Sequence, residues 1–176
     1  MRRLFVVGTG LLLALTPVIR GESAGTGAPP ARLALAPQSN AFFQCGPTTL
    51  AAVLAYYGTV VPEKTISDVI YSPTARGVLL TDMAWFARGQ GYVTSVRTGT
   101  LEDLQQALAA GHPPIVLLDL GVAGLKKPHF TALLGLSERG LHFQDRSDDG
   151  GVVSLEKFTR QWKRAGNQYL LVTRSP

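Results

Sequence analysis

Apolar residues recur at intervals of three and four along the segment from Leu50 to Tyr57. This is the spacing of an amphipathic α-helix. Pro47 suits the first turn of a helix, where its missing N–H is not needed, and Gly58 suits the left-handed position that follows a helix. The pattern therefore predicts a helix that begins at Cys45 and ends before Gly58.

The same spacing predicts four more helices. They are expected at about residues 62–70, 81–88, 101–110 and 155–164. In the first of these, Ile66, Val69 and Ile70 fall on one apolar face. Thr81 and Thr100 are residues of the type that caps a helix N-terminus.

Short apolar runs bounded by Gly, Pro and Asp dominate the second half of the chain and indicate β-strands. The expected strands are 92–96, 115–118, 129–136, 141–145, 152–153 and 169–173. The continuous run at 115–118 is typical of a strand buried on both faces. Residues 32–37 suit a short strand or an extended arm. Helices that precede an antiparallel sheet predict the α+β class.

The first 24 residues have the features of a secretory signal peptide. Arg2 and Arg3 precede an apolar run from Leu4 to Ile19, and small residues follow. A retained membrane anchor is the alternative, but the run is short and contains Pro17. We therefore expect a periplasmic or secreted bacterial protein with residues 1–24 as signal peptide, 25–35 as flexible lead-in and 36–176 as one domain.

Composition narrows the class of function. The chain has 176 residues, 45% hydrophobic and 16% charged, which suits one globular domain. Without the leader, 14 basic and 11 acidic residues remain, and this excess is too small to favour nucleic acid. No ligand spacing indicates a metal and no glycine motif indicates a nucleotide cofactor. We expect no cofactor, no metal, no nucleic acid and no membrane contact after cleavage; the oligomeric state stays open.

Cys45 is the one cysteine of the chain. A lone cysteine in an exported protein cannot form an internal disulfide, which favours a working thiol over a structural one. At a helix start, the partial positive charge favours the nucleophilic thiolate, and the unpaired N–H groups can bind an oxyanion. The alternative is a buried, inert cysteine, which is the commoner fate of this residue type.

A thiol nucleophile needs a base, and the chain offers three histidines. His129 begins a predicted strand after a loop, where a side chain can face a cleft. His112 lies in a predicted turn, and His142 faces water if its strand neighbours are buried. His129 is the preferred candidate.

A third group should orient the base. Asp145 ends the strand that returns from the strand of His129 through a tight turn, so the two residues should be neighbours. Asp148 and Asp149 are competitors that suit a turn better, and Asp119 is a weaker competitor at the end of another strand.

The order of these residues resembles a known family, the bacteriocin-processing (double-glycine leader) peptidases, which are papain-like cysteine peptidases. The segment Cys45–Gly58 resembles the helix that carries their nucleophile, His129–Gly135 their histidine strand, and Asp145 their aspartate. The resemblance covers about residues 36–174. It implies a papain-like fold with a helical N-terminal half packed on a C-terminal antiparallel sheet.

The resemblance also implies a glutamine for the oxyanion hole shortly before the cysteine. Gln38 is the preferred residue and Gln44 the rival. Relatives commonly form the front end of an export transporter, whereas this chain resembles the stand-alone exported members. The implied function is an exported cysteine endopeptidase of peptide or protein substrates, with Gly–Gly sites as a narrower form.

Two other functions remain open. The same Cys–His pair also suits a cell-wall peptide amidase or an acyltransferase. A non-catalytic papain-like module that binds a peptide is the third reading, although members of that kind typically lack the cysteine, which this chain has.

Overall fold

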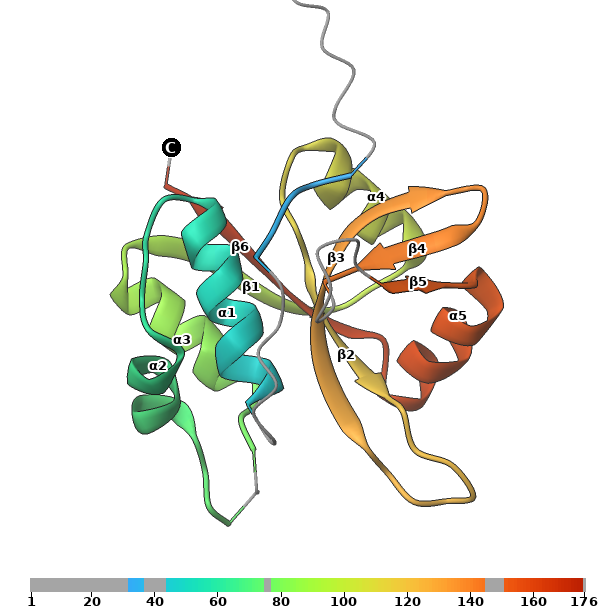
Figure 1. Ribbon diagram of the computed structural model, residues 1–176, viewed down its shortest axis with the longest axis horizontal. Helices are drawn as coiled ribbons and strands as arrows, with labels where there is room; N and C mark the ends of the chain where they lie inside the picture. Colours follow the sequence, from blue (N-terminus) through green and yellow to red (C-terminus); the bar gives the residue numbers. More distant parts are fainter. Residues whose placement is uncertain (1–31, 37–43, 75–76, 145–150, 176) are drawn as a thin grey trace, which may run out of the picture.

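The computed structural model describes residues 32–36, 44–74, 77–144 and 151–175, and Figure 1 traces these segments. Within them the chain forms five helices and six strands. The helices are α1 (Cys45–Tyr56), α2 (Glu63–Ile70), α3 (Leu80–Gly89), α4 (Leu101–Ala109) and α5 (Leu155–Arg164). The strands are β1 (Tyr92–Thr98), β2 (Ile115–Asp119), β3 (Pro128–Ser137), β4 (Gly140–Phe143), β5 (Gly151–Val153) and β6 (Gln168–Arg174).

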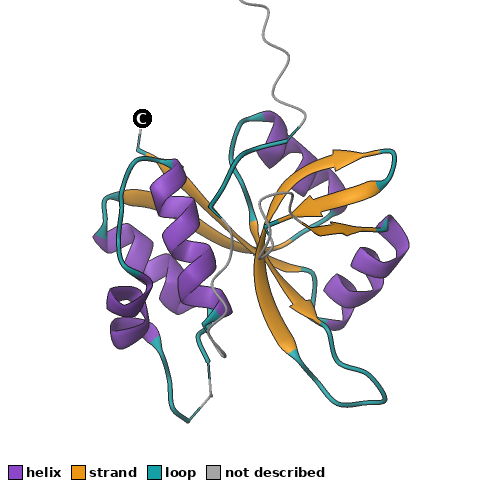
Figure 2. Cartoon of the chain, viewed as in Figure 1, coloured by secondary structure: helices purple, strands orange, loops and turns teal. Residues whose placement is uncertain are grey.

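The strands form one sheet in the order β1-β6-β2-β3-β4-β5, and each neighbouring pair is antiparallel. The predicted α+β class is confirmed. The last strand of the chain, β6, lies between β1 and β2. Because β1 comes between α3 and α4 in the sequence, the sheet also includes a strand from the mainly helical first half of the chain. Figure 2 shows α1, α2 and α3 gathered beside one end of this sheet, with α5 beside the other.

Side chains of the central strands alternate between two cores, as the period of a β-strand requires. Phe130, Ala132 and Leu134 pack with α1, α2 and α3, whereas Leu133 packs with Leu104, Phe158 and Trp162 of α4 and α5. Strand β2 contributes to both cores in the same way, which explains its continuous apolar sequence. The two cores hold the helices on opposite faces of the central strands.

Helix α1 begins at Cys45 and ends as predicted, with Gly58 in the left-handed region at φ 94°. It is not amphipathic, however. Eight of its twelve residues are buried, because α2, α3 and β3 surround it. The buried residues are Gly46, Pro47, Thr48, Thr49, Leu50, Ala52, Val53 and Leu54.

Some local predictions need correction. Helix α3 begins one residue before Thr81, with Leu79 at the N-cap and no side-chain cap bond. Val69 is 53% exposed, although Ile66 and Ile70 are buried as expected. Thr100 does cap α4, in a reciprocal capping box with Asp103.

Residues 32–36 form an extended segment against β3. The N–H of Leu33 donates to the carbonyl oxygen of Leu134 over 2.7 Å, at the point where the β3–β4 register shifts. The Leu33 side chain is buried in the core of α1 to α3. Among the described residues, no helix has both the length and the apolar character to cross a membrane.

Candidate functional site

Cys45 is the first residue of α1 and is partly buried. The carbonyl oxygen of Gln44, the N-cap residue, accepts the N–H of Thr48 over 2.9 Å and so begins the helical ladder. The N–H groups of the first helical residues have no acceptor within a helix. Since Pro47 has no N–H, this end of the helix offers the N–H groups of Cys45 and Gly46 for an oxyanion.

The first turn of α1 packs against the beginning of β3. Thr49, one helical turn after Cys45, donates its hydroxyl to the carbonyl oxygen of Phe130 over 3.3 Å, and this contact is buried. A Cβ atom on Gly46 would lie 3.3 Å from the Phe130 ring and 2.2 Å from Val78. Gly46 therefore allows the close approach of α1 to the segment of Val78 and to β3. Figure 1 shows that α1 and β3 both begin at this end of the molecule.

His129 immediately precedes Phe130 and is the second residue of β3. It is partly exposed, between exposed Pro128 and buried Phe130, and it pairs with Leu118 of β2. The predicted position of this histidine, at the start of a strand next to a loop, is confirmed. The backbone of β3 at Phe130 thus links the helix of Cys45 to the strand of His129.

Asp145 and Gln38 lie outside the described residues, as do Asp148 and Asp149. Ala36 and Gln144 are the last described residues before the two gaps that contain Gln38 and Asp145, and a hydrogen bond joins them. Gln144, immediately before Asp145, donates its side-chain amide to the carbonyl oxygen of Ala36 over 2.6 Å.

Gln144 is also fixed to β3. Its N–H donates to Ala132, and its carbonyl oxygen accepts the hydroxyl of Thr131 over 2.9 Å. Ala132 is three residues from His129. The segment that leads to Asp145 therefore continues the strand pairing of β4 along β3, toward His129.

The other two histidines have partners away from Cys45. His112 contacts the hydroxyl of Tyr57 at 3.1 Å. That hydroxyl donates its one proton to the carbonyl oxygen of Val172. In the contact with His112 the hydroxyl oxygen is therefore the acceptor, and Nδ1 of His112 is the donor. His142 bonds Ser137 through Nε2 at 2.7 Å, near the turn of the β3–β4 hairpin.

His142 is partly buried, so the prediction that it faces water is only partly right. Its Nδ1 is buried and has no hydrogen-bond partner among the described residues. Burial, and then the positive charges of Arg32 and Arg139, lower the pKa of His142 below its ordinary value. These features suit a neutral structural histidine.

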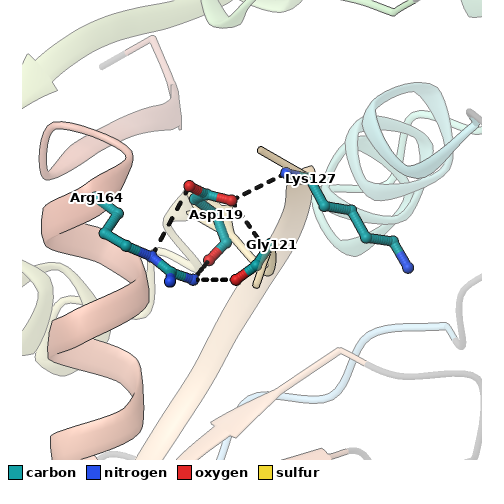
Figure 3. Close-up of polar contacts among 4 residues, drawn as sticks. All are labelled: Asp119, Gly121, Lys127 and Arg164. Atoms are coloured by element: carbon teal, nitrogen blue, oxygen red, sulfur yellow. Dashed lines mark hydrogen bonds and ion pairs between the residues drawn. The ribbon is translucent and has the colours of Figure 1, made fainter. Parts of the chain in front are cut away.

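The carboxylate of Asp119 is already engaged. Its Oδ1 atom accepts the N–H groups of Gly121 and Lys127, and Arg164 of α5 lies beside it (Figure 3). The two backbone hydrogen bonds, that of Lys127 first, hold the pKa of the Asp119 carboxyl below its ordinary value. Through these contacts the carboxylate holds the two ends of the β2–β3 loop together.

Gln44 caps α1 with its backbone, and its side chain makes no capping hydrogen bond. Two surface hollows, of about 620 and 460 Å³, lie on α5 and beside the C-terminal end of α1, and neither is lined by Cys45 or His129. In the described part of the chain, no three His, Cys, Asp or Glu side chains are grouped as metal ligands would be.

Two residues that bond to β3 near His129 were missed by sequence reasoning. Thr49 reads as an ordinary helical residue, and Gln144 as part of a strand end. A buried polar residue needs a hydrogen-bond partner, so a polar side chain within an apolar pattern is the signal that marks both.

Comparison with known proteins identifies the family and the fold of this chain. The model of the Peptidase_C39-like family matches residues 33–170. No match was found among the curated proteins. Solved structures of similar fold include the peptidase domain of Streptococcus ComA, a bifunctional ABC transporter involved in quorum sensing; it has 18% identity and a TM-score of 0.63, covering 81% of this chain and 98% of that domain.

Two further structures have the same fold. A double-glycine motif protease from an AMS/PCAT transporter, solved with its leader peptide, has 19% identity and a TM-score of 0.67 over 83% of this chain and 96% of its own. A Bacillus anthracis protein assigned as a C39-like peptidase has 18% identity and a TM-score of 0.66, covering 79% of this chain and 94% of its own. The fold is that of papain-like C39 peptidase domains, and the chain belongs to the Peptidase_C39-like family.

Proposed function

We propose that this protein is an active cysteine endopeptidase that hydrolyses peptide bonds through Cys45, His129 and Asp145. The observation that carries the proposal is the contact of the first turn of α1 with β3, at Thr49 and Phe130, immediately next to His129. Family and fold support a cysteine peptidase. The roles of the individual residues are our inference.

In the proposed reaction, His129 accepts the thiol proton and the sulfur of Cys45 attacks the carbonyl carbon of the peptide bond. The resulting oxyanion receives hydrogen bonds from the backbone N–H of Cys45 and from the side chain of Gln38. The C–N bond then breaks, and His129 gives its proton to the leaving amine. Water, deprotonated by His129, hydrolyses the thioester and restores the thiol.

Asp145 is proposed to hold the imidazole of His129 in the required orientation. Support comes from Gln144, which already pairs with Ala132 on the strand of His129. Support for Gln38 comes from the bond between Gln144 and Ala36, because that bond joins the segment before Gln38 to the segment before Asp145.

Substrate and location are further parts of the proposal. One solved protein of this fold is a double-glycine motif protease bound to its leader peptide. By analogy, a peptide is the expected substrate here, and cleavage after Gly–Gly is the narrower form. We propose export to the periplasm or medium after removal of residues 1–24, which mass spectrometry of the N-terminus of the exported protein would check.

The test compares the exported protein with its Cys45→Ala, His129→Ala and His142→Gln variants on a peptide library that includes Gly–Gly sites. Products are identified by mass spectrometry. Hydrolysis by the parent protein and by His142→Gln, with loss in the other two variants, is the expected result. Full hydrolysis by Cys45→Ala would refute the proposal.

The same experiment separates the alternatives. A trapped acyl group on Cys45 that passes to an added amine and not to water would indicate an acyltransferase, and cleavage restricted to cell-wall peptides would indicate an amidase. Peptide binding without hydrolysis, together with a Cys45 that does not react with iodoacetamide near neutral pH, would indicate a non-catalytic module.

A further inference from the structure

The loop between β2 and β3 is held by one carboxylate. Oδ1 of Asp119 accepts the N–H of Gly121 over 2.8 Å and the N–H of Lys127 over 2.9 Å. The N–H of Leu120 also donates to the carbonyl oxygen of Lys127. Both ends of the loop are therefore tied to the last residue of β2 (Figure 3).

Arg164, at the end of α5, reaches the same point from a distant part of the sequence. Its Nη2 atom donates to the carbonyl oxygens of Asp119 and Gly121, over 2.5 and 2.8 Å. Its Nε atom lies 3.8 Å from Oδ2 of Asp119. The planar guanidinium group thus contacts two carbonyls and a carboxylate together, a geometry that lysine cannot reproduce.

Gly121 is buried, but burial does not fix the rest of this loop. Residues 122–128 are all exposed, including Val122 at 72% and Leu125 at 76%. Leu120 and Lys127 pair one step beyond the β2–β3 ladder, through the bond from the Leu120 N–H to the Lys127 carbonyl oxygen, and the N–H of Lys127 donates to the carboxylate of Asp119.

The fixed end of the loop lies next to His129. Asp119 pairs with Pro128 and Leu118 pairs with His129 in the β2–β3 register. Beyond His129 the strand is held by the buried Phe130 and its bond to Thr49. On the loop side of His129, the backbone is held by the bond from Leu120 to Lys127 and by the contacts of Asp119 and Arg164.

We propose that Asp119 and Arg164 are positioning residues that hold the start of β3 so that His129 stays in reach of Cys45. This inference rests on the proposed function, because it assumes that His129 is the base for Cys45. Neither residue touches the reacting atoms. Their effect passes through the backbone from Lys127 to His129.

The test measures how fast iodoacetamide alkylates Cys45, as the ratio of the rate at about pH 6 to the rate at about pH 9. A thiolate paired with an imidazolium stays reactive at the lower pH, whereas an isolated thiol does not. This readout needs no substrate. The His129→Ala variant gives the value of this rate ratio when the proposed base is absent.

We expect Asp119→Ala and Arg164→Ala to lower this ratio by roughly tenfold, toward the His129→Ala value, because a small displacement of a catalytic group has a large effect on rate. Asp119→Asn keeps an oxygen that accepts both N–H groups and should retain most of the ratio. Arg164→Lys should fall between the parent protein and Arg164→Ala.

Two controls separate positioning from loss of stability. Arg160→Ala removes an exposed arginine of the same helix, which pairs with Glu156, and should leave the ratio unchanged. Thr100→Ala removes the cap of α4 and should lower the unfolding temperature without changing the ratio.

The outcomes are distinct. If His129→Ala lowers the ratio but Asp119→Ala and Arg164→Ala do not, the positioning proposal is overturned and the proposed function stands. If His129→Ala itself leaves the ratio unchanged, His129 is not the base, and both the proposed site and the positioning role are refuted.

Discussion

Thr49 donates its hydroxyl to the carbonyl oxygen of Phe130 over 3.3 Å, and this buried contact joins the helix of Cys45 to the strand of His129. The two residues are 81 positions apart in the sequence. Together with the packing of Gly46 against Phe130, this hydrogen bond holds in contact two segments that must meet if the protein is to act as a cysteine peptidase.

Replacing Thr49 by valine keeps the shape of the side chain and removes the hydroxyl. We expect a loss of about 1 kcal/mol in the free energy of unfolding, together with slower peptide hydrolysis, because the first turn of α1 loses this hydrogen bond to β3. Urea unfolding and hydrolysis assays measure the two effects. Thr94→Val, which removes a similar bond to Ala84 in the helical half, is the control. Equal activity of the two variants would count against the role of Thr49.

Gly46→Ala should destabilise the protein, because the new Cβ atom would lie 2.2 Å from Val78. Overpacking of this kind costs about 1–3 kcal/mol. The double variant Gly46→Ala, Val78→Ala makes room for the methyl group and should recover part of both stability and activity. A double-mutant cycle on unfolding free energies checks this coupling. Strictly additive effects would contradict the contact.

Tyr57→Phe should lower stability without changing the reactivity of Cys45. The hydroxyl bonds Val172 and His112 at the end of α1 far from Cys45, and burial raises the pKa of Tyr57 above its ordinary value. Its loss leaves a buried carbonyl without that partner, at a cost of about 1–3 kcal/mol. Thermal unfolding and the iodoacetamide rate are the two measurements, and a slower alkylation would show that the two ends of α1 are coupled.

His142 should make stability depend on pH. Its pKa is lower in the folded protein than in the unfolded chain, chiefly through burial. Between those two values the unfolded chain binds more protons, so stability rises with pH. The contribution of His142 is complete above the unfolded pKa of about 6.5 and decreases as the pH falls below it.

The His142→Gln variant should therefore lose less stability than the parent protein when the pH is lowered from about 8 to about 5.5. Urea unfolding at a series of pH values gives the comparison. The other histidines are common to both proteins, so the difference between the two slopes reports on His142. Identical slopes would show that His142 titrates alike in both states.

The sequence by itself determined the elements and the main candidates. Local spacing and end signals were enough to predict α1 from Cys45 and α5 from Leu155 to Arg164, because these features act within one or two helical turns. The same local logic placed His129 at the start of a strand. It failed at Val69 and Thr81, where packing between helices decides exposure and the starting residue.

Only the tertiary structure decided which segments meet. Helix α1 is buried on most sides, although its sequence spacing suggested one apolar face, because β3 comes from a distant part of the chain. Asp119 was a weak competitor for the role of Asp145, and the structure shows its carboxylate bonded to Gly121 and Lys127, with Arg164 from α5 beside it. These contacts depend on strand register and on packing across the sheet, which no local pattern contains.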